Sequence, residues 1–543
     1  MVHSLPAACW NMTGPLALPA SEWYTSLSRT DAGMLLLLHH NHSVPAAEAG
    51  DGMDIIDDGV MLPDQFEVVM GCFAFGIFVV LNACERLSCL PVGRMGSSLV
   101  GAFLMITFGV VCRRHVLHVL GDNMPLLALV WGTMVLSHFL TTHGRLLDAV
   151  EFVCTRSSFG AWDSCIKLSL ATSVLAAFLG WDIGALMLAP LALKIVQRHP
   201  GWPAKPFLAA VATGANAGSL LTPISNPGNV IVTLASGMKF TSFARKMFVP
   251  WVLAITINAL VVFAAYAKPL LSAVQSVEQE MPRDEESGQA NGSAESEDST
   301  SEASTSEGCE AGNTSMRRLA GRKFDAVKRH WRGVWAYAVW ALCLSFWFSD
   351  MELGAVALCG GVALIIGEWT DAAEPVMKSA EWPVIIYISG VLITVPSFNM
   401  TGVPAALWDW IVGTGAVSTV DFFGVLMLVF VISLFTNIVT NVPAVLLLSS
   451  RVAQLAVDEI NPGGSIHDGS DAATRGWLSV ALVAAMAGSL TVQGSITQVV
   501  AYDMGKAAPG GSVSFVEHLR VGIPVTVLTI ACCLPVVLAE VSM

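Results

Sequence analysis

The chain reads AGSLLTPISNPGNVIV over residues 217–232 and AGSLTVQGSITQVV over residues 487–500, two similar stretches at matching places in its two halves. Both are rich in small and hydroxyl-bearing residues, and both lie between apolar runs. A duplicated hydrophobic segment that glycine or proline interrupts is the sequence pattern that best indicates the binding site of a secondary transporter built from repeats. The two stretches therefore predict a membrane protein of that architecture.

The composition agrees with this prediction. Of the 543 residues, 54% are hydrophobic and only 13% are charged, whereas soluble domains carry roughly 25% charged residues. Apolar runs such as 96–112, 124–140 and 247–267 approach the roughly 20 residues that cross a bilayer as a helix. The chain is therefore expected to be a polytopic integral membrane protein.

Charge and cysteine content exclude several other classes. The formal net charge is −14, but eleven acidic residues and one arginine fall between positions 278 and 310, so the remainder is nearly balanced. No basic groove indicates a nucleic-acid partner. None of the 12 cysteines forms a CxxC pair, so the sequence predicts neither a zinc site nor a redox dithiol.

The order of segments repeats along the chain. Residues 64–271 and 333–543 each contain apolar spans, an amphipathic piece, a long span with a break, a small-residue segment and a final span. If each small-residue segment enters and leaves on one side, each half crosses about five times, which gives about ten crossings in all. An odd number per half inverts the second copy. The predicted fold is all-α, with two inverted repeats that each hold a broken helix and a re-entrant hairpin.

Two further segments complete the predicted organisation. Residues 1–63 read as an irregular extension. Residues 272–332 form a linker that is first acidic and rich in serine, threonine and glutamate, then basic. Such a composition predicts disorder, and basic residues that flank a span favour the cytoplasmic side. The linker is therefore expected to be cytoplasmic.

In the second half, polar residues recur along an apolar run. Their spacing puts all of them on one face of a continuous helix, and the run meets Pro443, which cannot donate a backbone hydrogen bond. These residues are Ser433, Thr436, Asn437, Thr440 and Asn441. Such side chains also serve as polar contacts between membrane helices, but a stripe that ends at a break favours a substrate path.

Asp182 is the matching polar residue of the first half. Aligning WDIGAL, from residue 181, with TNVPAV, from residue 440, sets Asp182 against Asn441 and Gly184 against Pro443. An ionised carboxylate at the membrane centre costs at least ~2.5–3.5 kcal/mol, so burial favours proton uptake or a neighbouring cation. Asp182 is the predicted coupling residue, and capping of the following half-helix is its alternative role.

The two small-residue segments supply neutral donors and acceptors. The first contains Thr222, Ser225, Asn226 and Asn229, and the second contains Ser489, Thr491, Gln493, Ser495, Thr497 and Gln498. Neither contains arginine or lysine. Hydroxyls and amides suit a neutral polyhydroxyl solute or a desolvated small cation better than a dicarboxylate, unless helix N-termini alone hold the negative charge.

Five ordered motifs resemble the plant-type silicon efflux transporters, which belong with the bacterial arsenite permeases in the ion transporter superfamily and its citrate transporter-like domains. The motifs are WDIG (181–184), TPISNPGN (222–229), FNMTGVP (398–404), TNIVTNVPAVLLL (436–448) and AGSLTVQGS (487–495). The resemblance implies a usually dimeric inverted-repeat protein that exports neutral metalloid hydroxides against protons. By position it assigns functional roles to Asp182, Asn226 and Asn441.

The sequence thus predicts a proton-coupled exporter of a small neutral oxyacid such as silicic or arsenous acid. Asp182 is the expected proton-coupling residue. The expected substrate-binding residues are Thr222, Ser225, Asn226, Asn229, Thr436, Asn437, Thr440, Asn441, Ser489, Thr491, Ser495 and Thr497. The alternative is a sodium/proton antiporter or a sodium-coupled anion carrier, with sodium at Ser225, Asn226, Thr440 and Asn441.

An enzyme is not expected, because the chain has no HExxH, GxSxG or P-loop motif. No cofactor is predicted. The expected partners are the solute, protons, membrane lipid and a second copy of the chain, and the expected location is the plasma membrane.

Overall fold

The computed structural model describes residues 65–83, 93–142, 145–156, 160–199, 201–271, 331–367, 382–460, 464, 466 and 470–540. The predicted extension 1–63 and almost all of the predicted linker 272–332 lie outside these residues. Every regular element within them is helical. This follows from the environment, because a lipid-facing segment must satisfy its own backbone hydrogen bonds.

The first half contributes ten labelled α-helices and one short 3₁₀ turn among the described residues, and a further helical stretch at 267–271 follows them. They are α2 (Gln65–Ala83), α3 (Arg94–Thr107), α4 (Arg113–Asp122), α5 (Met124–Thr142), α6 (Leu146–Thr155), α7 (Ala161–Leu179), α8 (Trp181–Arg198), α9 (Ala204–Gly218), η2 (Pro223–Ser225), α10 (Pro227–Ser236) and α11 (Phe240–Ala265).

The second half repeats this order. Residues 331–348 are helical. They are followed by α14 (Leu353–Gly367), α16 (Trp382–Met400), α17 (Val403–Gly413), α18 (Phe422–Val439), α19 (Asn441–Ile460), α20 (Asp471–Ala487), α21 (Ile496–Lys506) and α22 (Phe515–Glu540).

Seven of the described helices are long and apolar enough to cross a membrane, judged by length and composition. They are α2, α5, α7, α11, α16, α18 and α22, and α3 and α14 are shorter apolar helices. The second parts of the broken spans, α8 and α19, carry charge at their far ends, for example Arg198 and Asp458. The chain is an all-helical polytopic membrane protein.

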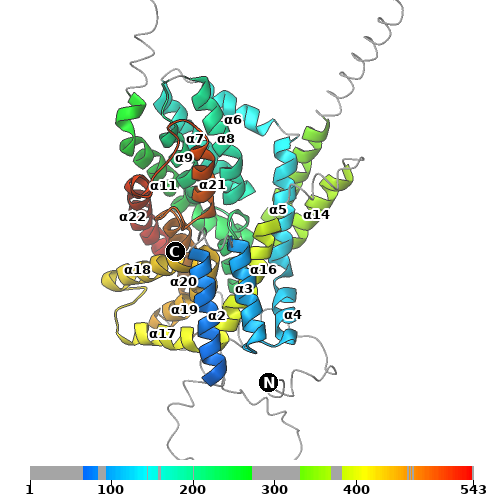
Figure 1. Cartoon of the computed structure of the whole chain (residues 1–543), viewed down its shortest axis with the longest axis vertical. Helices are drawn as coiled ribbons and strands as arrows, with labels where there is room; N and C mark the ends of the chain where they lie inside the picture. Colours follow the sequence, from blue (N-terminus) through cyan, green and yellow to red (C-terminus); the bar gives the residue numbers. More distant parts are fainter. Residues whose placement is uncertain are drawn as a thin grey trace, which may run out of the picture.

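The contacts between helices follow the repeat. The pair α5–α14 has its counterpart in α3–α16, and α8–α9 has its counterpart in α19–α20. The final spans α11 and α22 pack against each other. The corresponding amphipathic helices α6 and α17 lie at opposite ends of the long axis (Figure 1). The matching helix pairs and the opposite positions of α6 and α17 fit two copies that are inverted relative to each other.

The helices form two groups. The outer group contains α2, α3, α5, α14 and α16, and the inner group contains the broken helices, the hairpins and the final spans. We call α9–η2–α10 hairpin 1 and α20–α21 hairpin 2. The end of each hairpin crosses into the other half, because α10 packs on α19 and α20, whereas α21 packs on α8 and α9. The site elements are therefore shared by both repeats.

Small residues allow the outer helices to approach closely. A Cβ atom on Gly132 of α5 would lie 2.3 Å from the carbonyl oxygen of Ala357 in α14, and one on Gly354 would lie 2.3 Å from that of Pro125. Glycine at such crossings lets membrane helices pack backbone against backbone. These contacts make α5 and α14 a close pair against which the inner group can be positioned.

Candidate transport site

Each of the two long spans is broken at a single residue that has a positive φ angle. Helix α7 ends before Gly180, which has a φ of 104°, and α18 ends before Thr440, which has a φ of 73°. Glycine adopts this region readily. A β-branched threonine does so only where its surroundings hold it, at a cost of about 1–3 kcal/mol. The Thr440 hydroxyl is held by a 2.8 Å hydrogen bond to the Tyr387 hydroxyl of α16.

These breaks correct two details of the sequence prediction. Gly180, not Trp181, occupies the position equivalent to Thr440, so Asp182 matches Val442 and not Asn441. The prediction that five polar residues lie on one face of a continuous helix is also wrong, because α18 stops at Val439 and Thr440 does not continue that face. The cause is Pro443, which cannot donate to the Val439 carbonyl four residues earlier.

The carbonyls freed at the breaks are bonded by neighbouring spans. The Val439 oxygen accepts from Asn82 Nδ2 of α2 at 3.3 Å, and the Leu179 oxygen accepts from Ser137 Oγ of α5 at 3.4 Å. Buried backbone acceptors need such partners in a membrane. Asn82 and Ser137 are supporting residues that the sequence reading missed, since each lies far along the chain from its partner.

Asp182 is the second residue of α8. Its backbone therefore lies at the N-terminus of a half-helix that begins at the break, where the helix dipole favours a negative charge. Its side chain lies outside the described part of the structure. The predicted role in proton coupling stays a prediction.

Most predicted donors of hairpin 1 hold the hairpin itself. Thr222 Oγ1 donates to the Ala177 carbonyl of α7 at 2.5 Å. Ser225 Oγ is within 2.5 Å of the Ser219 oxygen and 2.6 Å of the Thr222 oxygen, and Asn229 Nδ2 donates to the same two carbonyls. All three side chains are buried. They fix the tip of hairpin 1 and seat it on α7.

Asn226 and Asn441 meet across the two halves. Asn226 caps α10, with its Oδ1 accepting from the Gly228 amide at 2.9 Å, and Asn441 Nδ2 donates to the same Oδ1 at 3.4 Å. Asn441 Oδ1 is buried, and no described residue donates to it. It lies close to Gly228, where an added Cβ would be 3.2 Å away. Two amide oxygens thus converge on the glycine of the hairpin tip.

The second broken helix holds hairpin 2. Asn437 Nδ2 donates to the Ala487 carbonyl at 3.1 Å, and its Oδ1 accepts from Thr491 Oγ1 at 2.8 Å. Thr436 differs, because its hydroxyl donates within its own helix to the Ile432 carbonyl. Asn437 and Thr491 therefore belong to the contact between α18 and the tip, whereas Thr436 makes no bond to either hairpin.

A buried amide in hairpin 1 gathers three hydroxyls of hairpin 2. Asn216 Nδ2 donates to Ser489 Oγ at 2.9 Å, and Asn216 Oδ1 accepts from Ser495 Oγ at 2.9 Å and Thr497 Oγ1 at 3.1 Å. All four residues are buried. We call them the Asn216 cluster. The sequence identified its three hydroxyls but missed Asn216, although an asparagine in the otherwise small-residue run of α9 was the available signal.

Gln498 adds unpaired amide groups beside this cluster. It follows Thr497 in α21 and is fully buried. Within the described ranges neither its Oε1 nor its Nε2 has a hydrogen-bond partner. Burying such groups unpaired costs about 1–3 kcal/mol each. An amide with one donor group and one acceptor is matched by a solute that carries hydroxyl groups.

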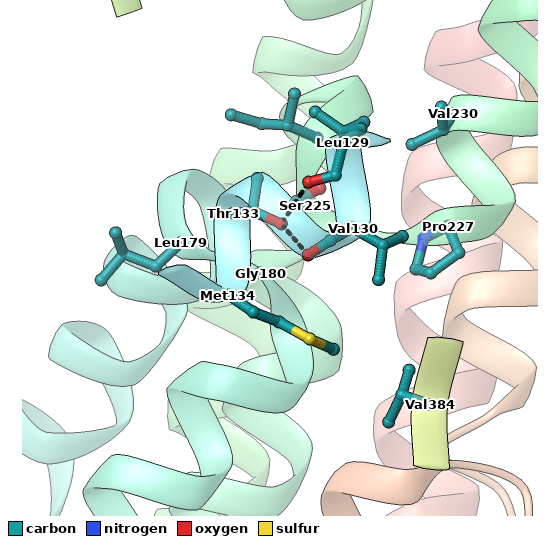
Figure 2. Close-up of a pocket in the computed structure, with 11 residues that line it drawn as sticks. Leu129, Val130, Thr133, Met134, Leu179, Gly180, Ser225, Pro227, Val230 and Val384 are labelled. Atoms are coloured by element: carbon teal, nitrogen blue, oxygen red, sulfur yellow. Dashed lines mark hydrogen bonds between the residues drawn. The ribbon is translucent and has the colours of Figure 1, made fainter. Parts of the chain in front are cut away.

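A small cavity lies where the first break meets hairpin 1 and the outer group. Thr133, Gly180 and Ser225 lie on one side of it, and Pro227 and Val384 lie on the other (Figure 2). Thr133 turns its hydroxyl to its own helix. The volume of about 30 Å³ accommodates about two waters. A larger solute does not fit into this cavity as it stands.

One basic side chain reaches a hairpin tip from the outer group. Arg94 Nη2, at the start of α3, donates to the Gln493 carbonyl in the hairpin 2 tip at 3.1 Å. Residues 206–237 and 476–505, around the two tips, contain no arginine or lysine, and Lys205, Arg475 and Lys506 lie at the outer ends of the hairpin helices. In the part of the chain that the structure describes, no three His, Cys, Asp or Glu side chains group as a metal site.

Comparisons with known proteins agree with this architecture. The family model of the citrate transporter, CitMHS, matches residues 77–472. The silicon efflux transporter LSI3 of Oryza sativa subsp. japonica is 29% identical over 497 residues, which cover 87% of this chain and 98% of LSI3. The putative transporter arsB of Dictyostelium discoideum is 22% identical over 523 residues, covering 82% and 88%.

A solved structure, the YdaH transporter of Alcanivorax borkumensis, covers 88% of this chain and 98% of its own, with 12% identity and a TM-score of 0.45.

Proposed function

Because the chain belongs to the citrate transporter family, CitMHS, we propose that it is a proton-coupled secondary transporter that exports a small neutral oxyacid such as silicic or arsenous acid. The single observation that carries the proposal is the set of neutral amide groups at the hairpin tips. Asn441 Oδ1 and both amide atoms of Gln498 are buried without partners among the described residues. The hydroxyls of an oxyacid both donate and accept, so they match these groups.

The absence of arginine and lysine from residues 206–237 and 476–505, around the hairpin tips, supports a neutral solute. A carboxylate or sulfate needs charge-assisted donors to offset its loss of water. An uncharged hydroxide loses less hydration free energy on entry. The relative named as a silicon efflux transporter supports the same substrate class.

Asp182 is the proposed proton carrier. The α8 N-terminus stabilises its charged form, whereas a site shielded from water favours the neutral form. These opposed effects allow a proton to load on one side of the membrane and leave on the other. In the proposed exchange, inward proton movement through Asp182 accompanies outward movement of one solute.

The alternative is a sodium/proton antiporter or a sodium-coupled anion carrier. It draws support from the convergence of Asn226 Oδ1 and Asn441 Oδ1 at Gly228 and from the Arg94 guanidinium at hairpin 2. Of the hydroxyls in the expected sodium site, that of Ser225 is donated to hairpin carbonyls and that of Thr440 bonds Tyr387. The proposal further includes a homodimer, as the family resemblance implies, and a location in the plasma membrane.

Flux from proteoliposomes tests the proposal. Vesicles loaded with silicic acid or arsenite are compared with and without an imposed pH gradient, for wild type and Asp182→Asn, in sodium and sodium-free buffer. We expect gradient-driven efflux that ignores sodium and is lost in Asp182→Asn. No oxyacid flux, together with sodium-dependent proton movement, overturns the proposal in favour of the alternative.

A further inference from the structure

A histidine near the start of the last span lies between the two arms of hairpin 2. His518 is the fourth residue of α22 and is fully buried. Its Nε2 is 3.0 Å from the Ser489 carbonyl oxygen, and its Nδ1 is 2.9 Å from the Tyr502 hydroxyl. Ser489 lies just after α20, and Tyr502 lies in α21. One imidazole therefore connects both arms of the hairpin to α22.

The partners determine the tautomer of this ring. A carbonyl oxygen only accepts, so Nε2 carries the hydrogen and donates to Ser489. In the neutral ring Nδ1 is then an acceptor, and the Tyr502 hydroxyl donates to it. The neutral imidazole thus satisfies both contacts at once.

The contact is closely packed as well as hydrogen-bonded. A Cβ atom on Gly522, one turn further along α22, would lie 2.8 Å from His518 Nε2 and 2.4 Å from the Ser489 oxygen. The ring and the carbonyl therefore lie directly against the backbone of α22. This leaves the hairpin tip little freedom to shift while the imidazole holds it.

Ser489 links the histidine to the candidate site. Its main-chain oxygen accepts from His518, whereas its side-chain Oγ accepts from Asn216 Nδ2 at 2.9 Å. Asn216 in turn holds Ser495 and Thr497. Displacement of the Ser489 backbone would move one corner of the Asn216 cluster.

We propose that His518 is a positioning residue that holds the hairpin 2 tip in the geometry the Asn216 cluster needs to receive the solute, and that only its neutral form does so. The reference to solute rests on the proposed function above. The contact with the hairpin does not, because it follows from the two hydrogen bonds and the packing at Gly522.

Protonation of this ring would disturb the arrangement. A second proton on Nδ1 makes that atom a donor, so the Tyr502 hydroxyl has to become an acceptor and its own hydrogen loses its partner. The described residues place no carboxylate in contact with the ring to balance the charge. Hairpin 2 is therefore expected to loosen as the pH falls.

The charged and titratable groups on the surrounding elements have other partners or positions. On α22 itself, Glu517 pairs with Lys205 of α9 at 2.6 Å, and Arg520 lies two residues beyond the ring. Tyr266 follows α11, and Tyr502 is the contact from α21. The charged residues of α21, Asp503 and Lys506, pair with each other at 2.6 Å. The charged residues of α20, namely Asp471 and Arg475, lie in its first two turns, at the end away from Ser489.

Three variants separate positioning from simple packing. His518→Leu removes both hydrogen bonds. His518→Gln keeps an N–H donor for the Ser489 carbonyl and an acceptor, but it does not titrate. Thr526→Val is the matched control, because Thr526 Oγ1 also bonds α22 to hairpin 2, at the Met486 carbonyl 3.1 Å away, without a titratable group.

Amide hydrogen exchange of the purified protein gives a readout that needs no transport. The amides of Ser489, Leu490 and Gly494 are hydrogen-bonded within the tip, so their exchange reports its opening. We expect His518→Leu to accelerate it about thirtyfold, the factor for losing two buried hydrogen bonds. His518→Gln should stay within about twofold of wild type, and Thr526→Val should accelerate exchange about fivefold, the factor for one lost bond, by the same amount at every pH. Between neutral and acidic pH, wild type should approach His518→Leu, whereas His518→Gln should not.

The inference is overturned if His518→Leu exchanges like wild type, or if His518→Gln shows the same acidic loosening as wild type. In vesicles with equal pH on both sides, His518→Leu should also raise the KM for oxyacid exchange about tenfold, with rescue by His518→Gln. If wild type moves no oxyacid, the proposed function fails, and the exchange pattern still decides the role of His518.

Discussion

Gly218→Ala tests whether hairpin 1 is seated on α7 as the structure shows. Gly218 is the last residue of α9 and the glycine of the first AGSL motif. A Cβ at this position would lie 2.2 Å from the Ser173 carbonyl oxygen and 2.6 Å from the Ser173 Cα. Both are backbone atoms of α7, so no side-chain rotation relieves the overlap.

The expected cost follows from this geometry. Non-bonded heavy atoms rest at about 3.5 Å, so α9 and α7 have to separate by roughly 1 Å. Overpacking of this kind costs about 1–3 kcal/mol. The same movement stretches the bonds Ser173 Oγ–Gly214 O (2.9 Å) and Thr222 Oγ1–Ala177 O (2.5 Å), each worth about 1 kcal/mol. Together the loss is about 3–5 kcal/mol, whereas helix propensity alone predicts a gain of about 1 kcal/mol for alanine.

The second AGSL motif supplies the control. A Cβ on Gly488 has its nearest contact at 3.3 Å, so Gly488→Ala should cost under about 1 kcal/mol. Thermal unfolding of both variants in detergent, followed by tryptophan fluorescence, is the assay, with vesicle flux as a second measurement. We expect Gly218→Ala to melt several degrees below Gly488→Ala and to lose transport. Equal melting temperatures would refute the inferred seating of hairpin 1.

Two further predictions concern the site and an ion pair. Asn441→Ala removes an Oδ1 that has no partner among the described residues, together with the bond to Asn226. The KM for oxyacid should therefore rise about tenfold with little change in melting temperature. The reverse pattern would assign Asn441 a structural role. Glu151 of α6 bonds Lys194 at 2.8 Å and pairs with Arg198, both in α8. The Lys194 hydrogen bond is the main cause that lowers the Glu151 pKa. A lowered carboxylate pKa contributes stability above the unfolded value of about 4.3 that is lost as pH falls through the folded value. The melting temperature of wild type should therefore drop on acidification below about pH 4, whereas Glu151→Gln should start lower and change less; parallel curves would contradict this.

The sequence was sufficient to locate the breaks and hairpins because these are local features. Gly180 ends α7 where the sequence predicted a break. Pro443 also explains why the Val439 carbonyl is free. The sequence could not fix the residue-by-residue alignment of the two halves, because a shift of one residue between them changes no local pattern. The structure sets Gly180 against Thr440 only because both carry a positive φ angle.

The partners of polar side chains could not be read from the sequence. Thr222 and Asn229 looked like free donors, but they bond carbonyls of α7 and of the hairpin tip. Asn437 finds Ala487 fifty residues away. Such pairings depend on how helices from different parts of the chain pack, which periodicity does not encode. Asn216 was missed for the same reason, because its role arises only when hairpin 2 lies against α9.

The two halves share a backbone plan but stabilise it with different side chains. The first break uses glycine and receives a hydroxyl from Ser137, whereas the second uses Thr440 and an amide from Asn82. Inverted copies that differ in this way give the two facing states different free energies and different affinities for solute. They cannot by themselves set the direction of net transport, since a coupled exchange runs down the sum of its gradients. In the proposed function, export follows from the proton gradient acting through Asp182, and the asymmetry of the repeats sets only the affinity on each side.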